Sequence, residues 1–499
     1  MSDWQAGLEP ALVWERFSEL TRIARPSKAE GFAREHVLAW AATRSLEASV
    51  DEAGNVVVRV PASSGRDGAA VVVLQSHLDM VCERDPASPF DPREGRLDVR
   101  VEKDWVRADG TTLGADNGIG VAAAMAAADD IEIAHGPLEL LFTVSEEQGL
   151  DGAKALDPAL VSGRLLLNLD GTSDDGLTIG CAGSDHTLLR TPLLAGSLPP
   201  DHVSLRVELS GAKGGHSGGD IAEGRANAIK TLGRVLTAAN VAAPFHLGAL
   251  EGGVSRNAIP RDASALVAVP SAAEATFRSS ADAGLATIVR EFAGTDDGLE
   301  LAIEPTATAA VADAESTMRV LDLIAAIPTG VLAMTPGLPE VVQTSTSLTT
   351  AATADGMITL GSMTRSSNAS ALDGVLETMR ALARLGNAEI DVRRSYPPWE
   401  PDLDSALLET AKATHARLFG SEPALTVVHG GLECAVLGQK LPGAEMVSIG
   451  PEIVSLHAPG ERLSISSTQR FYLLLGALLG DLSAQDRNQR SLVPVAQNP

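Results

Sequence analysis

The sequence has 499 residues, enough for two or three domains that each bury a core. Its apolar fraction of 44% is ordinary for a globular protein, and its formal net charge of −26 argues against nucleic acid as a partner, because phosphate binding needs a basic surface. Three widely separated cysteines, Cys82, Cys181 and Cys434, indicate a reducing compartment and not a disulfide framework. The acidic start of the chain and the lack of a run of about 20 apolar residues predict neither a signal peptide nor a membrane span, so we expect a cytoplasmic protein.

The first third of the chain alternates between helical and strand patterns. Apolar residues at helical spacing predict two helices within residues 11–46, with Pro26 between them. Short apolar runs bounded by turn residues predict buried strands, and an alanine-rich stretch predicts another helix. The expected strands cover residues 56–58, 71–74, 138–144 and 165–169, and the expected helix covers 118–128. Strands that alternate with helices are typical of a layered α/β domain.

The pattern changes after about residue 190. Half-buried strands and amphipathic helices then predict an inserted α+β domain with an antiparallel sheet. Its expected strands cover residues 203–209, 263–269, 299–303, 341–348 and 357–362, and its expected helices cover 221–239 and 281–292. The proline-rich segment 396–401 is interpreted as the return linker, and an apolar helix at 472–482 follows later. We therefore expect one discontinuous domain, residues 1–188 and 397–490, interrupted by a second, residues 189–396.

Polar groups follow the predicted buried strands, at the edge where α/β sheets build their sites. His77 and Asp79 come directly after the strand at 71–74 and, two residues apart, point to the same side. A carboxylate in that position can orient a metal-binding imidazole. Taken alone, however, the pair would by default be interpreted as a surface histidine beside a surface aspartate.

Four further carboxylates occupy similar positions. Asp116 precedes the predicted helix, where it can act as the N-cap, although the glycines around it permit a closer backbone approach than a cap requires. Glu146 and Glu147 follow the next strand, and their repulsion needs a cation or a shared proton to offset it. Because adjacent residues point to opposite sides, one can bind metal while the other acts as a general base. Asp170 ends a third strand, and this repetition favours a functional site.

The order and spacing of these residues resemble those of the M20 metallopeptidases. The residues that carry the resemblance are His77-Leu-Asp79, Asp109-Gly-Thr-Thr-Leu-Gly-Ala-Asp116-Asn-Gly, Glu146-Glu147-Gln-Gly-Leu and Asn168-Leu-Asp170. Further matching segments are Gly214-Gly-His216-Ser-Gly, Arg225-Ala-Asn-Ala, Asn257-Ala-Ile-Pro-Arg261, Arg365-Ser-Ser, His429-Gly-Gly-Leu-Glu-Cys434 and Ser455-Leu-His457-Ala-Pro-Gly-Glu461. Within the family the chain most resembles the aminoacyl-histidine dipeptidase branch, over nearly its whole length.

The resemblance implies a catalytic domain with a central mixed sheet, interrupted by an inserted α+β lid domain that is also the usual dimerisation surface. It implies two Zn²⁺ per subunit, with Mn²⁺ or Co²⁺ as possible substitutes. His77 and Asp170 would bind one zinc, and Glu147 and His457 would bind the other. Asp116 would bridge both, which suits the short metal separation of two-metal hydrolases.

The same resemblance implies roles outside the ligand set. Asp79 would orient the neighbouring histidine, and Glu146 would take a proton from the attacking water and deliver one to the departing amine. His216 of the lid would stabilise the tetrahedral oxyanion. Asn257 and Arg365 would contact the substrate, with Arg365 binding its free carboxylate.

Three assignments stay open. Arg256 and Arg261 lie close to the proposed asparagine contact and are alternative substrate contacts. His429 and Glu433 are expected to line a loop of the catalytic domain near the site, without an assigned chemistry. The segment 171–175 reads Gly-Thr-Ser-Asp-Asp where related dipeptidases usually carry Ser-Glu, which puts the tuning of metal affinity or substrate choice in doubt.

The leading hypothesis is a metallo-dipeptidase of broad specificity that also cleaves Xaa-His dipeptides such as carnosine. An M20-type aminoacylase or deacylase that acts on N-acyl amino acids is the alternative, because the metal site only activates water and the pocket selects the acyl group. A non-catalytic peptide-binding protein is a third hypothesis, against which the presence of Glu146 and all five ligands argues. The expected partners are a small peptide and a second copy of the chain bound through the lid, and neither nucleic acid nor a membrane.

Overall fold

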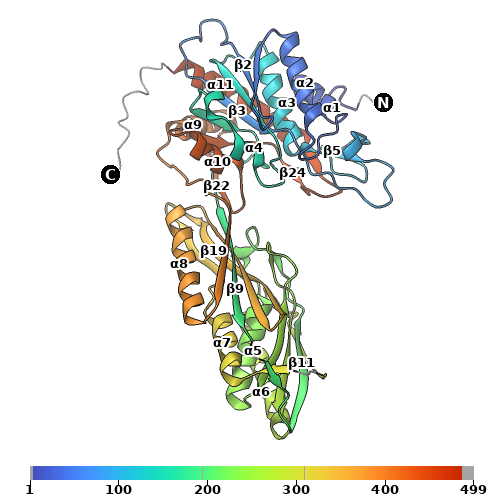
Figure 1. Ribbon diagram of the computed structural model, residues 1–499. Coiled ribbons are helices and arrows are strands. Elements are labelled where there is room, and N and C mark those ends of the chain that lie inside the picture. The colour runs from blue at the N-terminus through green and yellow to red at the C-terminus, as the bar shows by residue number, and fades with distance from the viewer. Residues whose placement is uncertain (1–3, 194, 308–309, 486–499) are drawn as a thin grey trace. The chain divides into compact units, whose positions relative to one another are not determined.

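A computed structural model describes residues 4–193, 195–307 and 310–485 of the chain (Figure 1). The expected outer limits of the first domain, residues 1 and 490, lie outside the described residues.

The chain divides into two compact units. Unit 1 comprises Met1–Gly180, Pro401–Val427 and Leu432–Pro499, and unit 2 comprises Cys181–Glu400 and Val428–Gly431. Each unit has a sheet of its own, so each is described separately.

Unit 1 is built on an eight-stranded mixed sheet with the order β1-β2-β6-β3-β7-β23-β8-β22. Its strands are β1 (Glu47–Val50), β2 (Val56–Val60), β3 (Val72–His77), β6 (Leu138–Thr143), β7 (Leu165–Asn168), β8 (Gly176–Cys181), β22 (Ala424–Val428) and β23 (Glu445–Ser448). Strand β3 pairs in parallel with both β6 and β7, whereas β2 joins β6 antiparallel. Every residue of β3, β6 and β7 is buried, as expected for parallel strands covered on both faces. The expected mixed sheet is confirmed.

The register of the three parallel strands brings their carboxyl ends to one edge. His77 lies opposite Thr143, and Gln75 lies opposite Asn168. Residues that follow these strands in sequence therefore emerge at the same edge, which is where open α/β sheets bind ligands.

The helices of unit 1 are α1 (Ala11–Leu20), α2 (Gly31–Thr43), α3 (Ala115–Asp129), α4 (Asp151–Ala155), α9 (Ala406–Phe419), α10 (Glu433–Lys440) and α11 (Ile465–Ala484). Helix α3 packs on β3 and against α1, and α11 packs against α9 (Figure 1). The alanines of α3 from Ala122 to Ala127 are buried, because small side chains let the helix approach both neighbours closely. A second sheet, β24-β25-β5-β4, has the loop 455–461 between β24 (Ile453–Val454) and β25 (Arg462–Ser464). Strands β4 (Val99–Glu102) and β5 (Trp105–Ala108) complete it.

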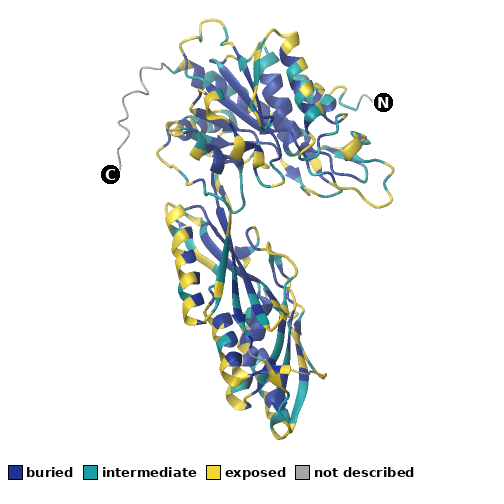
Figure 2. Cartoon of the chain, viewed as in Figure 1, coloured by how far each residue is buried: buried dark blue, intermediate teal, exposed yellow. Residues whose placement is uncertain are grey.

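Unit 2 is built on an antiparallel sheet with the order β16-β11-β15-β13-β19-β20-β9-β21, in which β18 also pairs with β19. Its strands are β9 (Gly183–Pro192), β11 (His202–Ser210), β13 (His246–Gly252), β15 (Ala263–Pro270), β16 (Glu300–Pro305), β18 (Gly330–Thr335), β19 (Leu338–Ala354), β20 (Met357–Ser366) and β21 (Glu389–Tyr396). Helices α5 (Ala228–Ala242), α6 (Glu274–Glu291), α7 (Ala314–Ala326) and α8 (Ala369–Leu385) pack against it. Figure 2 shows the inner faces of these helices buried and their outer faces exposed. The expected antiparallel α+β organisation is confirmed.

Several elements of unit 2 were not expected, namely strands β13, β18 and β21 and helices α7 and α8. Two further differences have a physical reason. The helix expected at 221–239 begins at Ala228, because the Asn227 side chain accepts a hydrogen bond from the Lys230 amide (3.1 Å) and caps the helix there. Strand β9 had no predicted counterpart, since four consecutive polar residues, from Ser184 to Thr187, are buried in it between two strands. Such a run lacks the apolar alternation that reveals a strand.

Across the described ranges, none of the helices combines the length and the apolar character that crossing a membrane requires. All three cysteines are buried thiols, as small core residues commonly are.

Candidate metal centre

Six titratable side chains gather at the carboxyl edge of the sheet in unit 1. They form three overlapping groups in which one ligand atom from each residue lies within 4.8 Å of the others. The groups are His77–Asp116–Asp170, His77–Glu146–Glu147 and Asp116–Glu147–His457. The structure thus brings all five expected metal ligands together with Glu146.

Asp116 lies between two histidines. Its Oδ1 atom is 2.9 Å from His77 Nε2, and its Oδ2 atom is 3.3 Å from His457 Nε2. It does not cap α3, since the N-cap position is Gly114 and the Asp116 backbone is not helical (ψ 109°). A carboxylate with one oxygen toward each imidazole has the arrangement expected of a ligand shared by two cations.

Each histidine also faces a second carboxylate. His77 Nε2 is 3.5 Å from Asp170 Oδ1, and His457 Nε2 is 3.0 Å from Glu147 Oε2. The other oxygen of Glu147 is buried without a hydrogen-bond partner, which in a native structure calls for a donor or a cation. Imidazole nitrogen and carboxylate oxygen are donor atoms that zinc accepts. The residues present therefore fit two divalent cations.

The cluster changes the acidity of its members strongly. Burial and the charge of Asp116 raise the pKa of Asp170 to about 7. Hydrogen bonds to Asp116 and Glu147 raise the pKa of His457 to about 10. In both residues the shift favours a bound proton, because the site concentrates negative charge that some positive charge must offset.

Asp79 contacts both His77 and the turn that contains Glu146 and Glu147. Its Oδ1 atom is 3.3 Å from His77 Nδ1 and accepts the Glu146 amide (3.0 Å). Its Oδ2 atom accepts the Glu147 amide (3.2 Å) and the Ser27 hydroxyl (2.7 Å). Burial alone would raise the pKa of Asp79. The hydrogen bond to His77, the positive charge of His77, and the hydrogen bonds from Ser27 and from the Glu146 amide outweigh this effect and lower the pKa of Asp79 to about 2. The carboxylate therefore stays ionised and fixes the turn.

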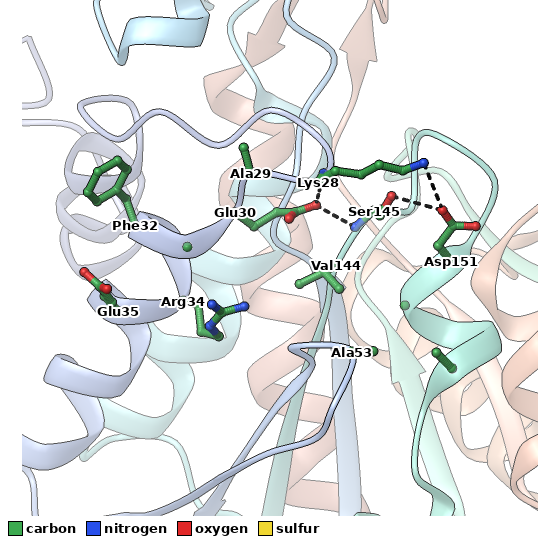
Figure 3. A pocket seen from close by; sticks show the side chains of 13 residues that line it. Lys28, Ala29, Glu30, Phe32, Arg34, Glu35, Ala53, Val144, Ser145 and Asp151 are labelled. Carbon is green, nitrogen blue, oxygen red and sulfur yellow. Dashed lines mark hydrogen bonds and ion pairs between the residues drawn. The ribbon is translucent and has the colours of Figure 1, made fainter.

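The same turn is held from its other side (Figure 3). Glu30 accepts the backbone amide of Ser145 (2.8 Å), and Ser145 has a left-handed backbone conformation (φ 52°). Lys28 and Ser145 both approach Asp151 at 3.5 Å. These residues line a cavity of about 690 Å³ in unit 1, which none of the six clustered side chains lines. We assign no ligand to this cavity; its wall fixes the residue that precedes Glu146.

Two buried ionic side chains, Arg25 and Glu461, hold the turn before Asp116. Glu461 accepts the amides of Leu113 (2.8 Å) and Gly114 (2.9 Å) on one oxygen and that of Ala115 (2.7 Å) on the other. It also accepts the Asp116 amide itself at 3.3 Å. The turn that bears Asp116 is thereby tied to the loop that bears His457.

Arg25 holds this turn from within unit 1. Its guanidinium donates to the carbonyls of Leu78 (3.0 Å), Asp79 (2.9 Å) and Gly114. Gly114 has φ 71°, and a Cβ atom there would lie 2.5 Å from Arg25 Nη2, so only glycine fits. Sequence reasoning missed both ionic residues: Glu461 lay within a matching segment but had no assigned role, and Arg25 gave no signal.

Packing explains why glycine occupies position 171, where related dipeptidases usually carry another residue. A Cβ atom at this position would lie 2.6 Å from the backbone carbonyl carbon of Ile449, so a side chain cannot be accommodated without a shift. Asp174 of the same segment is 2.6 Å from Arg470 on α11. The effect of the segment on metal affinity or substrate choice stays a prediction.

Unit 2 has a polar cluster of its own, centred on the buried Arg365 of β20. Its Nη2 atom is 3.5 Å from both His216 Nε2 and Asn257 Oδ1, and its Nη1 atom is 3.4 Å from the carbonyl oxygen of His429. Arg365 Nε is buried without a partner. A buried guanidinium with an unused donor is suited to an anion. Of the alternative contacts, Arg261 packs its stem against Gly214, and its contact with a substrate stays a prediction.

Two histidines of this cluster are neutral imidazoles. His216 Nδ1 accepts the amides of Gly218 (3.3 Å) and Gly219 (3.0 Å), which assigns the proton to Nε2. Burial and the charge of Arg365 lower the pKa of His429 to about 4, and its Nε2 atom is 2.7 Å from Ser345 Oγ. The expectation that His429 lines a loop of the catalytic domain is wrong, because residues 428–431 pack with unit 2.

Replacing Glu461 tests its role in holding the turn. We expect Glu461→Ala to lower the free energy of unfolding by about 3 kcal/mol or more, because several buried amides lose their acceptor and the buried Arg25 loses a nearby opposite charge. Urea unfolding of the full chain measures this change. Glu452→Ala, an exposed carboxylate in the same segment, is the matched control and should stay within about 0.5 kcal/mol. Equal stability of the two variants would contradict the assignment.

Comparison with known proteins identifies the family. Residues 73–480 match the sequence profile of Peptidase family M20/M25/M40. The chain is 33% identical over 479 residues to the cytosol non-specific dipeptidase of Escherichia coli (strain K12). The aligned region covers 96% of this chain and 99% of that protein.

Solved structures agree with the sequence match. The aminoacylhistidine dipeptidase of Vibrio alginolyticus superposes with a TM-score of 0.90 at 33% identity, covering 95% of this chain and 97% of that one. The aminopeptidase PepT of Bacillus cereus shares the fold, with a TM-score of 0.56 at 16% identity over 96% of this chain and 100% of that one. With the family profile matched over most of its length and a relative above 30% identity matched end to end, this chain belongs to peptidase family M20/M25/M40.

Proposed function

We propose that this protein is a metal-dependent dipeptidase of broad specificity, whose substrates include Xaa-His dipeptides such as carnosine. The observation that carries the proposal is the grouping of two histidines and four carboxylates within ligand distance, with Glu146 among them. The relatives from E. coli and V. alginolyticus, both named as dipeptidases, support the substrate class.

The cofactor we propose is a pair of Zn²⁺ ions, for which Mn²⁺ or Co²⁺ can substitute. His77 and Asp170 would hold one ion, Glu147 and His457 the other, and Asp116 would be shared. When bound, such ions make water a stronger nucleophile at neutral pH and polarise a carbonyl oxygen.

Glu146 is the proposed general base. Burial and the nearby charges of Asp170, Glu433 and Glu147 raise its pKa, although the charge of His77 opposes this. A carboxylate with a raised pKa takes a proton more readily, which is what a general base requires. Glu146 would accept a proton from the attacking water and deliver it to the amine that leaves when the peptide C–N bond breaks.

The cluster of unit 2 supplies the proposed substrate contacts. Arg365 would bind the free carboxylate of the peptide, since its Nε donor is buried and unused. His216 would donate its Nε2 proton to the oxyanion that forms at the attacked carbonyl, and Asn257 would help orient the substrate. Both dipeptides and N-acyl amino acids carry a free carboxylate, so the aminoacylase alternative must be separated by experiment.

A homodimer formed through unit 2 and a cytoplasmic location complete the proposal. Exposed apolar residues on two helices of unit 2, Met318 on α7 and Leu385 on α8, are compatible with a protein partner. The word "cytosol" in the name of the E. coli relative supports the location.

Metal removal and a substrate panel test the proposed function as a whole. We expect a chelator to abolish hydrolysis of dipeptides and added Zn²⁺ to restore it, because the ligand carboxylates and imidazoles alone do not activate water. The panel contains carnosine, other dipeptides and N-acetyl amino acids, assayed by chromatography with Zn²⁺, Mn²⁺ or Co²⁺. Activity that withstands chelation would exclude the metal mechanism, and turnover of N-acyl amino acids alone would establish the alternative.

Removing the proposed base tests the mechanism. Glu146→Ala should lower kcat at least about 100-fold, the typical contribution of a general base, without loss of bound metal. Steady-state kinetics and metal analysis of the purified protein measure the two quantities. The control is Gln148→Ala, an exposed side chain in the same turn, which should keep normal turnover. A Glu146 variant with full activity would refute this role.

Arg365 can be tested through the carboxylate that it is proposed to bind. Arg365→Lys should raise KM for a dipeptide about 10–100-fold, because a bond to a charged group contributes about 1.5–3 kcal/mol. KM for the corresponding dipeptide amide, which lacks the anion, should change little. Arg206→Ala, an exposed arginine of the same sheet, serves as the control. Equal effects on the acid and the amide would argue against carboxylate recognition.

A further inference from the structure

A buried carboxylate that the proposed mechanism does not use lies close to the metal cluster in unit 1. Glu433 is the first residue of α10, and its exposed fraction is 0%. Its charge is among the causes that raise the pKa of Glu146 and of Asp170. A buried carboxyl group is costly unless the surrounding structure uses it, so its contacts indicate what it does.

One oxygen of Glu433 joins two strands of the sheet. Its Oε2 atom accepts hydrogen bonds from Gln75 Nε2 on β3 (2.5 Å) and from Thr143 Oγ1 on β6 (2.6 Å). Gln75 lies two residues before His77, and Thr143 lies three residues before Glu146. The carboxylate therefore ties together the two strand ends from which a proposed metal ligand and the proposed base extend.

The hydrogen bonds continue to a third strand. Gln75 Oε1 accepts from Asn168 Nδ2 at 2.6 Å, and Asn168 Oδ1 accepts the backbone amide of Asp170 at 3.3 Å. Strands β3, β6 and β7 are thus linked side by side just before the residues that form the cluster. Hydrogen bonds that link neighbouring strands limit how far the strand ends can separate. This matters because metal ligands must be held within about 0.5 Å of their binding geometry.

We propose that Glu433 is a positioning residue of this site: by accepting hydrogen bonds from Gln75 and Thr143 it sets the spacing of the ligand-bearing strand ends. This inference rests on the proposed metallopeptidase function. It assigns a role to a residue for which the sequence offered none.

The acceptor oxygen, and not a negative charge, is what this role requires. Burial raises the pKa of Glu433 to about 7, against the opposing effects of His77 and the two hydrogen bonds, so the neutral form is accessible near neutral pH. Glu433 Oε1 is buried and has no partner. A glutamine has the same shape and can present its carbonyl oxygen to both donors, so it should replace the glutamate.

Three variants and one control test the proposal in the full-length protein. Glu433→Ala removes the acceptor, Glu433→Gln keeps it, and Thr143→Val removes one donor with little change in shape. Glu139→Ala is the control, because Glu139 is equally buried near the opposite end of β6, where it accepts the Ser162 hydroxyl (2.7 Å) and the Gly163 amide (3.0 Å). The readouts are the dissociation constant for Zn²⁺, obtained by competition with a chromogenic chelator, and kcat and KM for a cleaved dipeptide.

We expect Glu433→Ala to weaken Zn²⁺ binding at least about tenfold and to lower kcat by a similar factor with KM nearly unchanged, the effect typical of a lost partner behind the ligands. Thr143→Val should show a smaller loss of the same kind. Glu433→Gln should stay within about threefold of the parent protein in both readouts. The control should lose thermal stability but keep Zn²⁺ affinity.

Other outcomes would overturn the proposal. If Glu433→Gln were as impaired as Glu433→Ala, the charge and not the acceptor would matter. If Glu433→Ala bound Zn²⁺ like the parent protein, or if Glu139→Ala lost affinity to the same extent as Glu433→Ala, Glu433 would have no specific role. A parent protein that binds Zn²⁺ but cleaves nothing would refute the proposed function, while the affinity comparison would still decide the role of Glu433.

Discussion

Burial of several carboxylates at one sheet edge is the constraint on which the rest of unit 1 depends. Asp79 is buried, Asp116, Glu147 and Asp170 are largely so, and each lies within 3.5 Å of at least one of the two histidines. Each would be unfavourable there without compensation. Two kinds of compensation are present. Backbone amides and one hydroxyl serve Asp79, and the side-chain amide of Asn117 serves Asp170. The oxygens of Asp116 face imidazoles, whereas Glu147 has an imidazole at one oxygen and no partner at the other. This negative charge without a partner is the feature that suits the site to the proposed cations.

The supporting residues explain how loops can hold such a site. The turn with Glu146 and Glu147 is fixed by Asp79 on one side and by Glu30 on the other, and the turn with Asp116 is fixed by Glu461 and Arg25. These contacts use backbone atoms of the turns, so the side chains of the proposed ligands and base stay available. Precision at the site is thus built by buried ionic groups that would be out of place in an ordinary apolar core.

Unit 2 provides the opposite electrostatic character. Its cluster combines a buried arginine with two neutral histidines, which suits an anionic group, whereas the cluster of unit 1 suits cations. A peptide or an N-acyl amino acid carries both a carbonyl group that can be attacked and a free carboxylate, so the two kinds of cluster agree with the substrate classes that we propose. The chemistry that activates water is common to the family, while the choice of substrate depends on the residues that bind the rest of it.

The sequence by itself determined the periodic features: the buried strands, the antiparallel inserted domain, and the acids that follow three parallel strands, because these are encoded in local patterns of apolar and polar residues. His457 came only from the resemblance to a known family, since no local pattern connects it with Asp170. The tertiary structure alone decided which distant groups share a hydrogen bond. Glu461 and Glu433 are ordinary glutamates in the sequence, and His429 sits between segments of one unit yet packs with the other. Their partners depend on the path of the chain in space, which short-range patterns do not specify.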